Sequence, residues 1–94
     1  MKNTRHLVVA YDIQDDSLRD DLARTLFFYG LIRIQYSVFR GEVSNQDKDK
    51  ILVEIKNMEL QEGDKVIILD ICDDCLKREI VIGNVTNSPK HLVL

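Results

Sequence analysis

The chain has 94 residues, enough for a single domain spanning residues 1–94 and too few for a second. Hydrophobic residues make up 45% and charged residues 31% of it, a balance typical of soluble globular proteins and unlike that of disordered ones. The net charge of −3 argues against a strongly basic surface that binds nucleic acid, although a local stripe of basic residues is compatible with it. Its apolar runs are far shorter than the roughly 18–20 residues of a membrane span, and we see no secretion signal, so we expect a cytoplasmic protein without a membrane partner.

The N-terminal half predicts a strand, a helix and a hairpin. Residues 5–11 form a compact run of β-forming side chains, which indicates a strand with both faces buried. From residue 18, apolar side chains recur at helical spacing until Gly30, the expected stop. Residues 31–43 alternate in polarity but are long for one strand, so we place a tight hairpin near residues 35–37. The side chains able to cap the helix are those of Asp15, Asp16 and Ser17.

The C-terminal half predicts a second helix and further strands. Ser44 and Asp47 have the spacing of a capping box, and apolar residues on one face follow them. Residues 65–71 are a second run expected to be buried on both sides. We expect a short strand at residues 79–82 and a last strand at residues 91–94, beyond the only proline of the chain.

The order β-α-β-β-α-β with an additional C-terminal strand is that of the ferredoxin-like, split βαβ plan, an α+β fold. Right-handed crossovers place both helices on the same face of the antiparallel sheet. Two helices cover one face only, whereas the apolar runs predict strands that are buried on both faces. The simplest cover for the second face is another copy of the chain, so we predict a two-fold homodimer.

Asp12 ends the first buried strand and is the most informative residue for chemistry. A two-fold axis near this strand end would bring two Asp12 carboxylates together, and they cannot both stay ionised without a proton or a cation between them. Mg²⁺ accepts one or two carboxylates and keeps water or phosphate oxygens at its other positions. The residue is compatible with a shared metal site for phosphodiester hydrolysis, and an ordinary turn or cap aspartate is the alternative that residue patterns alone favour.

Basic and aromatic residues are expected near the same end of the fold. Arg19, Arg33 and Arg40 could bind phosphate through their guanidinium forks, and an exposed Phe39 could stack on a base. The alternative is a solvated charged face, with Phe39 and Tyr36 in the core or in the dimer interface.

Cys72 and Cys75 have the C-x-x-C spacing of a redox pair or of half a zinc site. The sequence has no second pair, so a Cys₄ zinc site would need two subunits. The adjacent aspartates disfavour the thiolate that a redox motif needs. Reduced structural thiols are the remaining interpretation.

Three short sequence motifs indicate more than the fold class. Residues 11–13 read Y-D-I, residues 15–19 read D-D-S-L-R, and residues 30–41 read G-L-I-R-I-Q-Y-S-V-F-R-G. With them the chain closely resembles the CRISPR-associated protein 2 family, the smaller of the two widespread CRISPR adaptation proteins. The resemblance is strong over residues 8–41 and looser from there to residue 83.

The resemblance implies a ferredoxin-like homodimer in which Asp12 of both protomers can hold a divalent metal such as Mg²⁺, and in which residues 91–94 pair with the partner's sheet. Family members are described as metal-dependent endonucleases of single-stranded RNA or double-stranded DNA. They are also described as the bridge between two dimers of the CRISPR integrase during spacer acquisition in antiviral defence.

The positions that match family residues implicated in substrate handling are Arg19, Arg33 and Phe39, and Ser37 lies in the same motif. In one respect this chain departs from the pattern. Some members have a second basic residue where this chain has Asp21, which weakens the expectation of strong nuclease activity.

Two functions of different classes follow. In the first, Asp12 of each chain binds Mg²⁺, and Arg19 and Arg33 steady the scissile phosphate. In the second, the dimer is a non-catalytic architectural protein that bridges integrase dimers and binds protospacer DNA. A ligand-binding regulatory module on the same fold has no glycine-rich or polar pocket signature in its favour.

Overall fold

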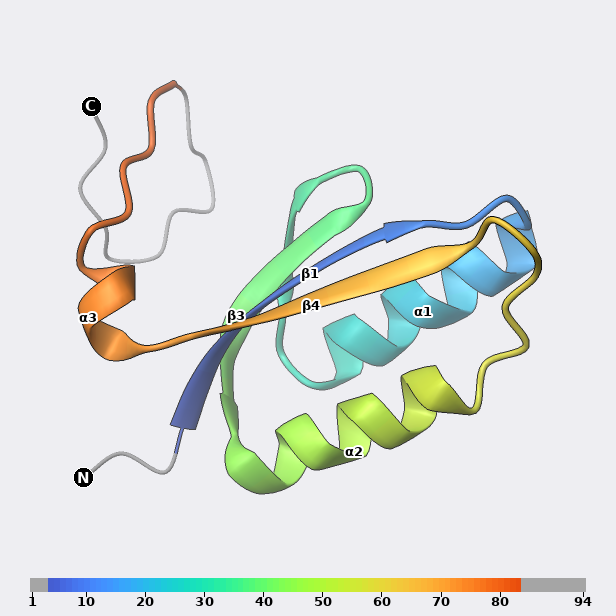
Figure 1. Ribbon diagram of the computed structural model, residues 1–94, viewed down its shortest axis with the longest axis horizontal. Helices are drawn as coiled ribbons and strands as arrows, with labels where there is room; N and C mark the ends of the chain where they lie inside the picture. Colours follow the sequence, from blue (N-terminus) through green and yellow to red (C-terminus); the bar gives the residue numbers. More distant parts are fainter. Residues whose placement is uncertain (1–3, 84–94) are drawn as a thin grey trace.

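A computed structural model describes residues 4–83, which form four strands and three short helices (Figure 1). In chain order they are β1 (Thr4–Asp12), α1 (Asp16–Phe28), β2 (Ile32–Gln35), β3 (Val38–Ser44), α2 (Asn45–Lys56), β4 (Lys65–Ile71) and α3 (Asp73–Leu76). The first six follow the predicted order β-α-β-β-α-β. The helices of the described chain all fall short of the length and apolarity that crossing a bilayer requires.

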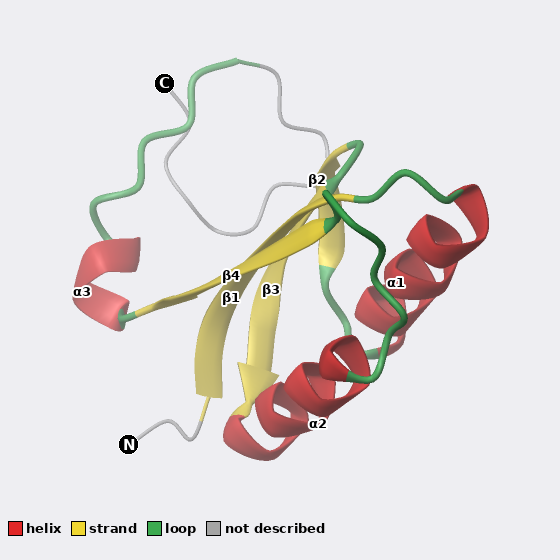
Figure 2. Ribbon diagram, turned by 45° about the vertical axis from the view of Figure 1, so that its right-hand side comes forward, coloured by secondary structure: helices red, strands yellow, loops and turns green. Residues whose placement is uncertain are grey.

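The four strands make one antiparallel sheet in the order β2-β3-β1-β4. In the centre of the sheet, Val9 of β1 lies between Phe39 of β3 and Ile68 of β4. Helices α1 and α2 both lie against one face of this sheet (Figure 2). We call this the covered face and the opposite one the open face.

The core lies between the covered face and the two helices. Alternate residues of β1 point into it, as the two-residue period of a strand requires, and the apolar stripes of α1 and α2 meet them. Fully burying a side chain of this kind contributes roughly 1.5–3 kcal/mol to folding. Its fully buried members are Leu7, Val9, Leu22, Leu26, Leu31, Phe39 and Ile51.

Side-chain caps begin both main helices where the sequence places them. The carboxylate of Asp15 accepts a hydrogen bond of 2.8 Å from the Leu18 amide, and the Ser44 hydroxyl accepts one of 3.0 Å from the Asp47 amide. After α1, Gly30 takes a φ of +88°, a conformation that glycine adopts without strain. These caps explain why the predicted helices begin and end as they do.

Gly41 is a packing residue within β3. A Cβ atom at this position would lie 2.9 Å from the Cα atom of Leu31, a backbone atom that cannot turn aside. Only glycine lets β3 pass this closely beside the residue that leads into β2. Close packing against Leu31 therefore explains the glycine at position 41, the last residue of the motif at residues 30–41.

The open face is only partly covered in the described part of the chain, because Glu79 reaches the buried Arg40 on this side while the β4 residues remain exposed. Ile67 and Leu69 of β4 point to this side and are 51% and 52% exposed, whereas Leu7 and Val9 on the covered face are 0% exposed. The expectation that the strand at residues 65–71 is buried on both sides therefore does not hold within one chain.

Beyond β4 the chain differs from the prediction. Helix α3 was not expected, and the predicted strand at residues 79–82 is wrong, since Val81 alone forms an isolated β-bridge there. Glu79 is bonded to Arg40 of β3, which draws this segment across the sheet instead of along an edge strand. The strand predicted at residues 91–94 lies outside the described residues.

Candidate functional site

Asp12 is the last residue of β1 and pairs with Lys65, the first residue of β4. Because Tyr11 is buried on the covered face, strand alternation directs Asp12 to the open face. The predicted position at a strand end is confirmed. Within one chain the carboxylate of Asp12 is exposed to solvent.

Arg19 braces the loop that follows Asp12. Its Nη1 atom donates to the carbonyl oxygens of Ile13 at 3.1 Å and Gln14 at 3.4 Å, and its Nη2 atom pairs with the carboxylate of Asp16. The guanidinium thus fixes the backbone directly after the candidate metal ligand. In this arrangement Arg19 positions the loop, a role that residue spacing alone did not indicate.

The β2–β3 turn reaches the same end of the sheet. The carbonyl oxygen of Ser37 accepts a hydrogen bond of 3.0 Å from the amide of Tyr11. Ser37 is therefore held beside the strand end that presents Asp12. We call Asp12, Arg19 and Ser37 the strand-end cluster.

Arg33 and Phe39 lie together on the covered face, the side of the sheet opposite to the one that Asp12 faces. The guanidinium carbon of Arg33 lies 5.0 Å from the ring centre of Phe39, 5.6 Å from that of Phe27 and 5.9 Å from that of Tyr36. Phe39 is 0% exposed, so it is a core residue and offers no free ring face to a base. Phe27, which is 52% exposed, was missed because it lies off the apolar stripe of its helix.

Arg40 does not join the strand-end cluster, contrary to the expectation that the three arginines share one end of the fold. Its Nε atom donates to Nε2 of His6 at 3.2 Å, and its Nη1 atom donates to Glu79 at 2.6 Å. Arg40 pairs with Val8, four residues before Asp12, which places it about 13 Å from that position along the strand. Only 6% exposed, Arg40 is a structural ion-pair residue.

One chain does not make a complete metal site at Asp12. Among residues 4–83 no group of three or more His, Cys, Asp or Glu side chains could hold a metal ion. One carboxylate per chain fits Mg²⁺ only if a second copy contributes its own, because this ion is bound by one or two carboxylates with water or phosphate oxygens completing its shell. The donor set is thus compatible with a shared site between two chains.

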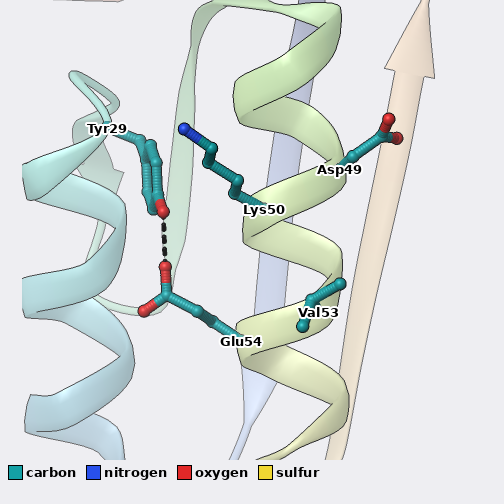
Figure 3. Close-up of a pocket in the computed structure, with 5 residues that line it drawn as sticks. All are labelled: Tyr29, Asp49, Lys50, Val53 and Glu54. Carbon is teal, nitrogen blue, oxygen red and sulfur yellow. Dashed lines mark hydrogen bonds between the residues drawn. The ribbon is translucent and has the colours of Figure 1, made fainter.

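An open hollow of about 320 Å³ lies on the helix side of the molecule, between the end of α1 and the outer surface of α2 (Figure 3). Across it the phenol of Tyr29 donates a hydrogen bond of 2.5 Å to Glu54. This bond is the main reason that the pKa of Tyr29 is raised to about 12. The phenol stays protonated and braces the two helices, and the hollow shares no residue with the strand-end cluster.

The fold and the strand-end aspartate define a small α+β protein with a four-stranded antiparallel sheet, two helices on one face and an acidic residue at the end of the central strand β1. Residues 5–79 match the family model of CRISPR associated protein Cas2, and the chain belongs to this family. The resemblance seen in the sequence is confirmed.

Similar proteins agree with this assignment. The CRISPR-associated endoribonuclease Cas2 1 of Archaeoglobus fulgidus is 40% identical over 79 residues, covering 84% of this chain and 83% of the relative. A crystal structure of a Cas2 protein has the same fold, with a TM-score of 0.71 at 22% identity over 97% of this chain and 99% of the other. A chain in a partial Cas6-RT-Cas1–Cas2 complex has a TM-score of 0.55 at 32% identity over 80% and 87%.

Proposed function

We propose that this protein is a CRISPR adaptation protein that acts as a homodimeric, metal-dependent endonuclease of single-stranded RNA or double-stranded DNA and as a component of the spacer-integration complex. Family membership supports the general role, because similar proteins are named endoribonucleases and one is solved with Cas1. The observation that carries the catalytic part is Asp12, an exposed carboxylate at the rim of the open face, where Ile67 and Leu69 are also exposed.

The homodimer follows from the open face. The sheet order β2-β3-β1-β4 is compatible with the ferredoxin-like plan, in which the helices leave one face free. Ile67 and Leu69 are about half exposed on that face, and a contiguous apolar surface of this kind is typical of an interaction site. A two-fold axis through this face uses the same surface on both chains, as isologous dimers do.

In the dimer, the Asp12 carboxylates of both chains would hold Mg²⁺. When bound, such an ion lowers the pKa of a water ligand and neutralises charge on a phosphodiester. Arg19 keeps the backbone after Asp12 in place through its bonds to Ile13 and Gln14. Ser37 accepts a hydrogen bond from the Tyr11 amide through its carbonyl oxygen, which holds the backbone directly before Asp12.

Arg33 is the group available to contact a phosphate. It is exposed at the edge strand β2, and the buried ring of Phe39 lies beneath its guanidinium. Stacking on an aromatic ring leaves the guanidinium edge, with its N–H donors, free to bind phosphate oxygens. Phe39 then acts as the support of Arg33 and does not touch the nucleic acid itself.

The second candidate function is the non-catalytic architectural dimer that bridges integrase dimers and binds protospacer DNA. It is favoured by the guanidinium of Arg19, which is already bonded to two carbonyl oxygens and one carboxylate. Asp21 supports it as well, because it places a negative charge where some family members have a basic residue. Under this function Asp12→Asn spares complex formation and spacer integration.

A cleavage assay with labelled RNA and labelled duplex DNA tests the catalytic proposal. We expect cleavage with Mg²⁺, no cleavage with a chelator, and a loss of roughly 100-fold or more for Asp12→Asn, because the charge that holds the ion is removed. Asp20→Asn, which removes an exposed carboxylate of α1, is the matched control and should retain activity. Cleavage that is equal in wild type and Asp12→Asn, in protein freed of contaminating nucleases, contradicts it.

An assembly assay tests the architectural function separately. Wild type and Asp12→Asn should bind the integrase subunit and support spacer integration equally. Removal of residues 84–94, which include the predicted C-terminal strand, should abolish assembly. If Asp12→Asn instead blocks integration while binding is intact, the aspartate is needed for the adaptation reaction and the architectural function is insufficient.

A further inference from the structure

The two cysteines of the chain lie side by side at the start of α3, at the opposite end of β4 from Asp12. Both are free and exposed. Cys72 is the residue that caps α3, and Cys75 is the third residue of the helix. The sequence left open whether they are a redox pair, zinc ligands or inert thiols, and the described geometry bears on that choice.

The Cys72 side chain folds back over the first turn of α3. Its Sγ atom accepts a hydrogen bond from the backbone amide of Cys75 at 3.3 Å. Side chains three residues apart are neighbours on a helical turn, and a disulfide requires Cβ atoms about 3.5–4.5 Å apart. The 3.3 Å contact of the Cys72 sulfur with the Cys75 amide holds both residues at one turn, where side-chain rotation and a tightening of that turn would allow an intramolecular disulfide.

The two thiols differ in acidity. Hydrogen bonds from Cys75, first from its thiol and then from its amide, lower the pKa of Cys72, although the Asp74 carboxylate opposes the change. The same thiol–thiol hydrogen bond is the largest cause that raises the pKa of Cys75. A thiolate is the attacking species in disulfide exchange. This difference favours Cys72 as the attacking sulfur and Cys75 as the resolving one.

We propose that Cys72 and Cys75 are a reversible dithiol–disulfide site that reacts with low-molecular-weight disulfides such as oxidised glutathione. The Cys72 thiolate attacks one sulfur of the small disulfide, which forms a mixed disulfide and releases one small thiolate. Cys75 then loses its proton to solvent and attacks the Cys72 sulfur, which breaks the mixed disulfide and releases the second small thiolate. The protein gives up two electrons, and the small disulfide takes them up as two thiols.

The site lies where the chain leaves the sheet. Glu79 follows Cys75 by four residues and is bonded to the nearly buried Arg40 of β3 at 2.6 Å. A disulfide would close the turn between β4 and this anchor, so its formation constrains the path of the chain over the open face. This inference does not depend on the proposed nuclease, because no residue of the strand-end cluster takes part.

Zinc binding is the competing use of these thiols. Residues 4–83 hold no third His, Cys, Asp or Glu positioned to complete a metal site with them. A zinc ion would need the cysteines of two chains, and the test below includes that outcome.

The test uses the full chain, equilibrated with glutathione buffers of different ratios of reduced to oxidised form. After acid quenching, free thiols are alkylated with a maleimide, and intact mass and non-reducing electrophoresis are recorded. We expect both thiols to be lost together in a monomeric band, with the loss of two hydrogen atoms, and to return when the reduced form is in excess. Cys75→Ser should accumulate one glutathione on Cys72, whereas Cys72→Ser should react several-fold more slowly.

Three results would overturn the proposal. These are thiols that stay free at every ratio, a disulfide that links two chains, or thiols that are protected by zinc in a ratio of one ion to two chains. Circular dichroism of both serine variants checks that they fold. Asp12→Asn should show the same loss of thiols as wild type across the glutathione ratios. The outcome of this test is therefore independent of whether the nuclease proposal is correct.

Discussion

The two faces of one sheet have opposite surroundings in this protein. On the covered face, Leu7 and Val9 of β1 are fully buried against two helices. On the open face, Ile67 and Leu69 of β4 remain half exposed, although they belong to an equally apolar strand. A strand that is apolar on successive residues therefore signals burial on both sides without showing which side the chain itself covers.

Residues on the two sides of the sheet also have different roles, in stability on one side and in the proposed chemistry on the other. Side chains buried between the covered face and the helices, such as Phe39 of β3 and Leu26 of α1, hold the domain together. The residue with the strongest candidate role in catalysis, Asp12, is directed to the open face, where a partner chain can approach it. The following predictions test this division, from the largest expected effect to the smallest.

The covered face should carry most of the stability. Leu26→Ala removes a fully buried side chain of α1, and it should lower the free energy of unfolding by about 2–5 kcal/mol, because a cavity is left in a packed core. Urea unfolding followed by circular dichroism measures the change. Val53→Ala on the outer side of α2, where Val53 is 56% exposed, should stay within about 0.5 kcal/mol. Equal losses for the two variants would contradict the assignment of the core.

The open face should control association instead. Leu69→Glu places a charge on the open face, in the proposed interface, and should raise the dimer dissociation constant by at least about 100-fold, because both copies of the charge would be desolvated. Sedimentation equilibrium measures the mass, and circular dichroism should show that helix content is kept. Val53→Glu on the helix side is the matched control and should remain dimeric. A Leu69→Glu protein that stays dimeric would show that this face is not the interface.

Gly41 tests how closely the covered face is packed. Gly41→Ala should cost about 1–3 kcal/mol of unfolding free energy, because its Cβ would press on the backbone of Leu31. Gly30→Asn should cost less, since nothing lies within 4 Å of a Cβ there and asparagine tolerates a positive φ. Thermal unfolding of both variants provides the comparison. If Gly30→Asn lowers the stability more than Gly41→Ala does, backbone strain at residue 30 outweighs packing at residue 41.

Asp70, at the rim of the sheet, should give the smallest effect. Its carboxylate accepts hydrogen bonds from Lys48 at 2.5 Å and Arg5 at 2.9 Å, and the bond to Lys48 is the main reason that the pKa of Asp70 is lowered. A depressed folded-state pKa stabilises the fold above the unfolded-state value of about 3.9 and loses this effect as the pH falls through the folded-state value.

Asp70→Asn should therefore lower stability by about 0–1 kcal/mol at pH 7, the range of partly exposed ion pairs. The difference between wild type and variant should disappear in strong acid and shrink at high salt. Thermal unfolding across pH and salt measures it. A difference that persists below the folded-state pKa would show that Asp70 acts through packing and not through its charge.

Local signals made much of the fold predictable. The caps Asp15 and Ser44 and the stop at Gly30 set the helix ends, and they are encoded within a few residues of their targets. The hairpin was predictable because residues 31–43 are too long for one strand. Predictions failed after residue 71, where Cys72 caps an unexpected turn and a distant ion pair with Arg40 directs Glu79.

The candidate site was predictable in position but not in contacts. Asp12 could be placed because a strand end is visible in the sequence. The bonds of Arg19 to two carbonyl oxygens depend on how α1 returns to the strand end, which spacing does not encode. The position of Arg40 was not predictable, because its partners His6 and Glu79 are more than thirty residues away in the sequence.

The presence of one carboxylate per chain at the strand end makes concentration a variable of the proposed chemistry. If the site is complete only when two copies meet, the fraction of chains that carry one rises with the total amount of protein and falls on dilution. Specific activity per chain should then increase with concentration until dimers saturate, so scarce protein in a cell would be inactive without any inhibitor.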